Sequence, residues 1–180
     1  MQLNHWSLLL GALLAAKGLF ALLATPAAQR VARRFARAVW TGRVLATIAW
    51  LWAGWALYTM PLEILAPVRA FIPWLTLAVI PLSWFWMADL LSCRAVGGLL
   101  VLFPCPLLLV ARFHPSPWRL VPVTFAYACI VAGMFLILYP YYLRRALAFF
   151  ADRPVWMRLA GAAALALGAC FLALGLTALR

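Results

Sequence analysis

Apolar runs of roughly membrane-spanning length dominate the chain, and short segments between them hold most of its charged residues. A transmembrane helix needs about 20 mainly apolar residues to cross the hydrocarbon core of a bilayer. The pattern therefore predicts an all-α, polytopic membrane protein with about six transmembrane helices, forming a single domain over residues 1–180. The expected spans are residues 8–23, 44–58, 70–91, 95–111, 121–139 and 159–179.

Prolines interrupt two of these runs. Pro73 and Pro81 lie within the third, and Pro104 and Pro106 flank Cys105 in the fourth. Proline inside a helix removes a backbone hydrogen bond and kinks the helix. We therefore expect a strong bend near Cys105, after a tight turn at residues 92–94, and whether residues 95–111 cross the whole membrane stays open.

Residues 27–40, between the first two runs, have a different pattern. Four arginines fall on one arc of a helical wheel, and alanine, valine and phenylalanine fall on the opposite arc. This pattern is typical of an amphipathic helix lying in the membrane interface. Thr25 and Pro26 are expected to begin it, as N-cap and first helical residue. A second polar segment, residues 140–158, precedes the last run.

The composition agrees with a membrane protein and changes how the charge is interpreted. The chain is 69% hydrophobic and 10% charged, with a formal net charge of +12. Such a charge could indicate nucleic-acid binding, but that function needs a basic face with polar surroundings. Here the arginines stand at the ends of apolar runs, where they set orientation. We therefore expect no nucleic-acid partner.

The distribution of arginines predicts the topology. If the N-terminus is outside, the inner segments hold ten basic residues and the outer ones four, a clear positive-inside bias. Both termini are thus expected outside a bacterial-type inner (cytoplasmic) membrane. Trp118 and Trp156 are expected at outer and inner interfaces, respectively. The inner set is Arg30, Arg33, Arg34, Arg37, Arg43, Arg94, Arg144, Arg145, Arg153 and Arg158, and the outer set is Arg69, Arg112, Arg119 and Arg180.

Lipid headgroups are the best-supported ligands of the inner segments. Each basic residue near an anionic surface contributes about 1 kcal/mol of attraction. The same arginines could instead serve only to set orientation, and the two roles are compatible. The candidate anionic-lipid contacts are Arg30, Arg33, Arg34, Arg37, Arg144 and Arg145.

Two charges fall deepest within the predicted spans. Lys17, the only lysine, lies in the first span, and Asp89 lies near the inner end of the third. Ionisable residues within a span are costly and mark functional sites. The two are a candidate intramembrane ion pair, in which each charge lowers the cost of the other. Alternatively, Lys17 extends its amine to the interface.

The remaining residues predict neither an enzyme nor a cofactor or metal site. The four cysteines form no CxxC pair, and Cys105 alone is not a metal site. The three acids have different predicted depths, and Asp152 is expected to pair with Arg153 or to cap a turn. No nucleophile, zinc or phosphate-loop motif is present in the sequence.

The first and last hairpins, residues 8–60 and 121–180, resemble each other and form a possible repeat. In the second, Gly133, Pro140, Arg144-Arg145, Pro154 and Arg158-Leu-Ala-Gly161 keep a distinctive spacing before an Ala- and Leu-rich run. This hairpin, about residues 130–175, resembles the YjeT-like short two-helix bacterial inner-membrane proteins. That family has no assigned activity, so the resemblance implies architecture only. The first hairpin departs from it, with four clustered arginines and no second proline.

Three functions fit these observations. Small residues such as Gly97 and Gly98 favour close helix packing, so the leading hypothesis is a non-enzymatic accessory or scaffold subunit with a membrane-protein partner or a second copy. The alternative is a small transporter or channel using Lys17 and Asp89. A third is a lipid enzyme using His114 or the inner arginines. A tightly packed bundle without a polar cavity would favour the accessory subunit. A polar cavity at mid-membrane would favour the transporter or channel, and a polar lateral opening would favour the lipid enzyme.

Overall fold

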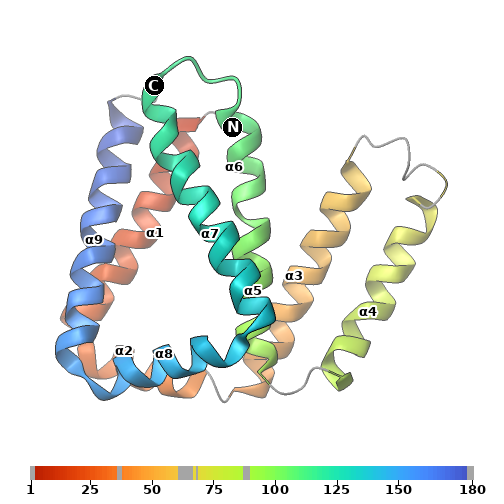
Figure 1. Cartoon of the computed structure of the whole chain (residues 1–180), viewed down its shortest axis with the longest axis horizontal. Helices are drawn as coiled ribbons and strands as arrows, with labels where there is room; N and C mark the ends of the chain where they lie inside the picture. Colours follow the sequence, from red (N-terminus) through yellow and green to blue (C-terminus); the bar gives the residue numbers. More distant parts are fainter. Residues whose placement is uncertain (1–2, 36–37, 61–66, 68, 87–89, 178–180) are drawn as a thin grey trace.

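The computed structural model describes residues 3–35, 38–60, 67, 69–86 and 90–177, and every regular element in these ranges is a helix. The all-α prediction is therefore confirmed. Most of the helices run up and down the molecule, whereas α2 and α8 lie across one end (Figure 1). The elements are α1 (Leu3–Leu23), α2 (Thr25–Phe35), α3 (Val39–Thr59), η2 (Arg69–Phe71), α4 (Ile72–Trp86), α5 (Leu91–Leu102), α6 (Pro104–Ala111), η3 (Pro117–Arg119), α7 (Leu120–Leu138), α8 (Pro140–Asp152) and α9 (Pro154–Leu176).

Five stretches are long and apolar enough to cross a membrane, as expected of a membrane protein. No more than 28% of the most apolar window of each stretch is buried inside the isolated chain, and only an apolar solvent can cover the remaining apolar surface at low cost. The stretches are Leu3–Leu23, Arg69–Trp86, Leu91–Ala111, Pro117–Leu138 and Pro154–Leu176.

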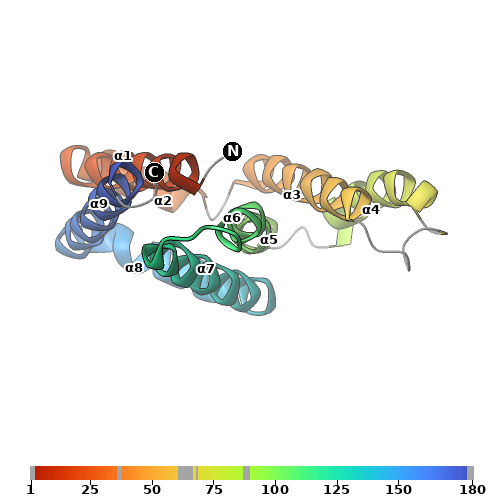
Figure 2. The ribbon, with the colours of Figure 1, turned by 90° about the horizontal axis from the view of Figure 1, so that it is seen from above.

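Neighbouring helices form a row that runs from the α1–α9 pair through α7 and α5 to α3 and α4. The helix α1 packs along α9, α5 packs along α7, and α3 packs between α4 and α5. Viewed from above, α4 stands at the far end of this row, beyond α3 (Figure 2). Both chain ends lie at the end of the molecule opposite α2 and α8 (Figure 1).

The backbones of two helix pairs approach closely where glycine faces glycine. A Cβ atom built on Gly18 of α1 would lie 2.6 Å from the carbonyl oxygen of Gly161 in α9. One built on Gly133 of α7 would lie equally close, at 2.6 Å, to the carbonyl oxygen of Gly97 in α5. Lipid tails are as apolar as leucine, so membrane helices associate through such close backbone packing. These glycines therefore position the helix pairs.

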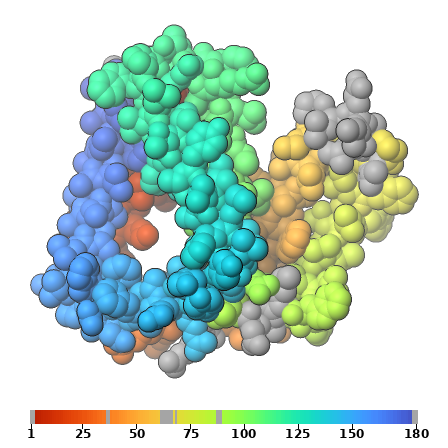
Figure 3. Space-filling model, viewed as in Figure 1, coloured from red at the N-terminus to blue at the C-terminus, as the bar shows by residue number. Residues whose placement is uncertain are grey.

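The α1–α9 pair packs against α6 and α7 in the half of the molecule near the termini. There Leu10, Leu107 and Ala126 form a buried cluster that joins α1, α6 and α7. Phe171 of α9 meets Phe125 of α7 edge to face, with ring centroids 5.1 Å apart. Toward the other end, the space-filling view shows an opening between α7 and the α1–α9 pair, above α8 (Figure 3).

Residues 92–94 do not form the expected turn. They belong to the first turn of α5, which begins at Leu91. The chain turns earlier instead, at Leu90, whose φ of 61° is left-handed. The polar residues Ser92 and Arg94 suggested a loop, but both can sit in a helix near a membrane interface.

The expected strong bend near Cys105 is instead a one-residue interruption. Between α5 and α6, Phe103 keeps helical dihedral angles, and its N–H still donates to the carbonyl of Leu99 at 2.9 Å. Pro104 then occupies the first turn of α6, where its missing N–H costs nothing. The helix α6 thus continues in nearly the direction of α5 (Figure 1).

Thr25 also differs from the N-cap expected of it. Its hydroxyl donates backwards, to the carbonyl oxygens of Ala21 at 3.0 Å and Leu22 at 3.2 Å. Thr25 therefore satisfies carbonyl groups at the end of α1, which would otherwise have no partner in the helix. The sharp change of direction into α2 follows at this residue.

Candidate functional site

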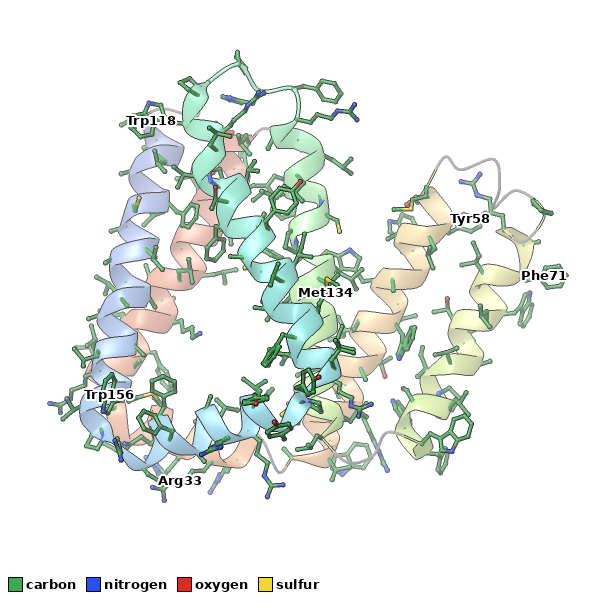
Figure 4. The ribbon with its side chains drawn as sticks, viewed as in Figure 1. Arg33, Tyr58, Phe71, Trp118, Met134 and Trp156 are labelled. Atoms are coloured by element: carbon green, nitrogen blue, oxygen red, sulfur yellow. The ribbon has the colours of Figure 1, made fainter. Side chains whose placement is uncertain are left out.

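The two helices that lie across one end of the molecule carry most of the candidate lipid contacts. The helices α2 and α8 pack against each other, with Ala28, Ala32 and Ala151 buried. The candidate arginines on both helices have exposed side chains, and Arg33 lies on the outward side of this end in Figure 4. Those described are Arg30, Arg33, Arg34, Arg144 and Arg145, whereas Arg37 lies outside the described residues.

An ion pair links these two helices. One Nη of Arg33 donates to a carboxylate oxygen of Asp152 at 3.0 Å and to the carbonyl oxygen of Ala151 at 3.1 Å. Asp152 therefore pairs with Arg33, 119 residues away, and not with its neighbour Arg153 as predicted. Both side chains are more than half exposed, so the pair contributes at most about 1 kcal/mol.

The proposed Lys17–Asp89 pair stays a prediction. Lys17 is exposed on α1, next to Gly18, which faces α9. Asp89 lies outside the described residues, as does Glu63. Asp152 is the one acid that the structure describes, and it is engaged with Arg33.

Sequence reasoning missed a cluster at the ends of α3, α4 and α5 that lie on the side of α2 and α8. The guanidinium carbon of Arg43 lies 5.4 Å from the ring centroid of Trp40 and 5.8 Å from that of Trp84. Gly42, beside it, faces the backbone N–H of Ser92 at the start of α5. A cation over an aromatic face is stabilised by about 0.5–2 kcal/mol, depending on its desolvation. We interpreted Arg43 as a topology signal only, and its position three residues after Trp40 was the available clue.

Three nitrogen atoms on α3, α4 and α5, near this end of the three helices, are buried without a hydrogen-bond partner among the described residues. They are Nε of Arg43, Nε of Arg94 and Nε1 of Trp84. Buried donors in proteins are nearly always satisfied, and an exception suggests an ion or ligand. The arrangement could therefore bind an anion.

A groove of about 390 Å³ runs from Arg94 between α3 and α5. Arg94 is the one charged residue on its walls, and Ser83 supplies the one hydroxyl. That hydroxyl is already used, since it donates to the carbonyl oxygen of Ile80 at 2.7 Å. The rest of the wall is apolar, so the groove is suited to a chain of hydrocarbon attached to an anionic group.

Two other hollows among the described residues are mainly apolar too. One of about 410 Å³ lies between α3 and α4, around Gly54 and Pro73. The other, of about 620 Å³, lies near the termini and includes Cys105 and Arg112.

The remaining chemistry-bearing residues have structural contacts. His114 accepts a hydrogen bond at Nδ1 from the N–H of Ser116, at 3.2 Å, within the loop before η3. Arg119 closes this loop by donating to the carbonyl oxygens of His114 at 2.6 Å and Arg112 at 3.2 Å. Within the described ranges, no three His, Cys, Asp or Glu side chains gather as a metal site would require.

The comparisons with known proteins add no relative. No protein-family model, curated protein or solved structure matches the chain, and the resemblance of residues 130–175 to YjeT-like proteins stays a prediction.

Proposed function

We propose that the protein is a six-span, non-enzymatic accessory or scaffold subunit of a bacterial-type inner membrane. The sixth span is α3, which has 21 residues and packs between α4 and α5. Its four tryptophans and Arg43 lower its mean hydropathy, but tryptophan is enriched near membrane interfaces.

The position of the arginines supports an orientation with both termini outside. Of the described arginines, nine lie at the end of the molecule with α2 and α8, and three lie at the end with the termini. Trp118 and Trp156 stand toward opposite ends, as interfacial anchors do (Figure 4). In this orientation α2 and α8 lie in the inner interface, with their arginines on anionic headgroups.

The single-sided packing of α4 is the observation that carries the accessory role. This helix packs on α3, where a Cβ built on Gly54 would collide with the Thr76 hydroxyl. Its other sides expose Trp74, Leu75 and Phe85. Because helix contacts stabilise a bundle in lipid, a partner helix against α4 would complete its packing.

We expect labelling to place both termini outside. Cysteine-free protein with a single cysteine added after Arg180 should react with a membrane-impermeant maleimide in intact cells. Cysteine placed at Arg34 or Arg145 should react only after the membrane is opened. Labelling of Arg34→Cys in intact cells would contradict the orientation.

Crosslinking should locate the partner. A photo-reactive residue at Leu75 or Leu82 on α4 should give one discrete protein adduct in cells. Controls at Val131 on α7 and Leu167 on α9, which are similarly exposed, should give lipid adducts only. The partner identified from α4 should copurify when co-expressed with the wild type, and Leu75→Arg should abolish this.

Other outcomes would overturn the accessory role. Lipid adducts alone at α4 would leave this helix without a partner protein. Ion or solute flux through the purified protein in vesicles, lost in Lys17→Met, would favour a transporter.

A further inference from the structure

The groove between α3 and α5 has the dimensions of a hydrocarbon site within one leaflet. On α3 its wall extends from Ala46 to Ala53, and on α5 from Leu91 to Leu102. At 1.5 Å per residue these stretches are about 10 and 16 Å long. Half of a hydrocarbon core about 30 Å thick is about 15 Å. The groove thus covers about one leaflet, starting at the end that carries α2 and α8.

Small residues keep the groove open. A Cβ built on Gly98 would meet only the Cβ of Ala49, at 3.8 Å, which is ordinary contact. The adjacent Gly97 is different, since a Cβ there would lie 2.8 Å from the carbonyl oxygen of Gly133. The two neighbouring glycines therefore have different roles. Gly97 allows α5 to pack closely on α7, and Gly98 leaves room between α5 and α3.

The inner end of the groove supplies positive charge. Arg94 lines it one helical turn from Gly98, and its Nε is buried without a partner among the described residues. Nearby, Trp84 packs on the cluster of Ala46, Leu91 and Ala95, and its ring lies under Arg43. A phosphate oxygen is a strong acceptor for such guanidinium groups.

We infer that this groove binds one phospholipid with an anionic headgroup, its phosphate at Arg94 and Arg43 and one acyl chain along the apolar wall. Free phosphate would use only the arginine end, and a neutral hydrocarbon only the wall. A phospholipid uses both, because its charge and its chain are joined as the two parts of the site are. The inference rests on the proposed membrane orientation but not on the accessory role.

The test compares lipids on purified full-length protein. Native mass spectrometry of the wild type from mild detergent should show one retained phosphatidylglycerol. Added phosphatidylglycerol should raise the unfolding temperature more than phosphatidylcholine does. Arg94→Gln and Arg43→Gln should each weaken this binding at least tenfold. Arg112→Gln, at an exposed arginine that follows α6 at the opposite end of the molecule, is the matched control and should bind as the wild type does.

The apolar part of the site is tested from both walls. Ala49→Phe and Gly98→Leu fill the groove and leave both arginines in place, and each should lose the retained lipid while keeping its helical circular dichroism. Val44→Phe adds the same bulk at an exposed position of α3 and should keep the lipid. If one filled variant fails to fold, the other decides.

Three results would overturn the inference. Lipid retained by both Arg94→Gln and the groove-filled variants would place it elsewhere. Stabilisation by inorganic phosphate equal to that by phosphatidylglycerol, and unaffected by Ala49→Phe, would make it a free-phosphate site. A wild type that binds no phosphatidylglycerol, and acquires binding in Asp89→Asn, would show that Asp89 neutralises the arginines. If α4 gave no crosslink to a partner protein, only the accessory role would fail, because none of these lipid-binding measurements depends on a partner protein.

Discussion

Replacing Gly18 by valine is expected to separate α1 from α9 and to destabilise the protein by about 3 kcal/mol, the upper part of the range for overpacked sites. The Cβ of any larger residue would lie 2.6 Å from the carbonyl oxygen of Gly161 and 2.7 Å from the backbone nitrogen of Leu165. Both obstacles are backbone atoms of α9, which cannot move aside as a side chain can.

The effect should extend along the whole helix pair. A Cβ at Gly168 would lie 2.6 Å from the backbone nitrogen of Ala15, so the two helices approach closely from both sides. Moving the backbones apart at one glycine therefore loosens contacts at the others. Since helix association in lipid depends on this packing, no hydrophobic term offsets the loss.

The measurement is reversible unfolding of the purified protein in detergent by added sodium dodecyl sulfate. Gly98→Val is the matched control, because a Cβ there meets only Ala49 at 3.8 Å. It should unfold within about 1 kcal/mol of the wild type, as substitutions without a steric conflict do. A Gly18→Val protein as stable as this control would show that α1 and α9 are not in backbone contact.

The second large effect is expected for Phe171→Ala, at about 2–3 kcal/mol. Phe171 is 2% exposed and contacts Phe125 of α7 edge to face. Truncation leaves a cavity of roughly 100 Å³, and each Å³ costs about 24 cal/mol. The estimate contains only this cavity cost. It omits the free energy of transferring the ring out of water, because in the unfolded protein the side chain would face lipid instead of water.

Phe171 is also expected to hold α9 next to α7, because few other contacts join these two helices. Crosslinking between cysteines placed on α7 and α9 near this contact should therefore slow in Phe171→Ala. Leu167→Ala, an exposed position of the same helix, should change neither the stability nor the crosslinking rate. Equal losses in the two variants would mean that the ring is not a buried contact.

Much of the local structure could be predicted from the pattern of residues. Apolar runs located the long helices to within a few residues at most ends. The four-arginine arc located α2, because an amphipathic helix separates its polar and apolar faces in a way that periodicity reveals. The expected end at residue 40 was wrong, since α2 ends at Phe35 and α3 begins at Val39. Pro140 did not reveal α8, which we described only as a polar segment, although proline is common in the first turn of a helix.

The helix pairings could not be predicted in the same way. In a soluble protein an apolar stripe indicates the buried face, but in lipid both the packed and the exposed faces are apolar. Glycines were visible in the sequence, yet nothing there said that Gly18 faces Gly161 or that Gly97 and Gly98 have different neighbours.

The site around Arg43 and Arg94 was missed for a related reason. Each arginine ends an apolar run. Only the packing of α3 with α4 and α5 brings Arg43 to the ring of Trp84 and places Arg94 on the wall of the groove.

The sequence by itself therefore determined the class of protein, the positions of most long helices and the end of the molecule at which arginine gathers. These features follow from composition and run length, which the bilayer imposes on each segment separately. The tertiary structure alone decided which helices meet, which glycines carry those contacts, that Asp152 pairs with Arg33, and where charge and groove combine. These features depend on contacts between segments distant in the sequence or on opposite faces of one helix, and local hydropathy carries no information about them.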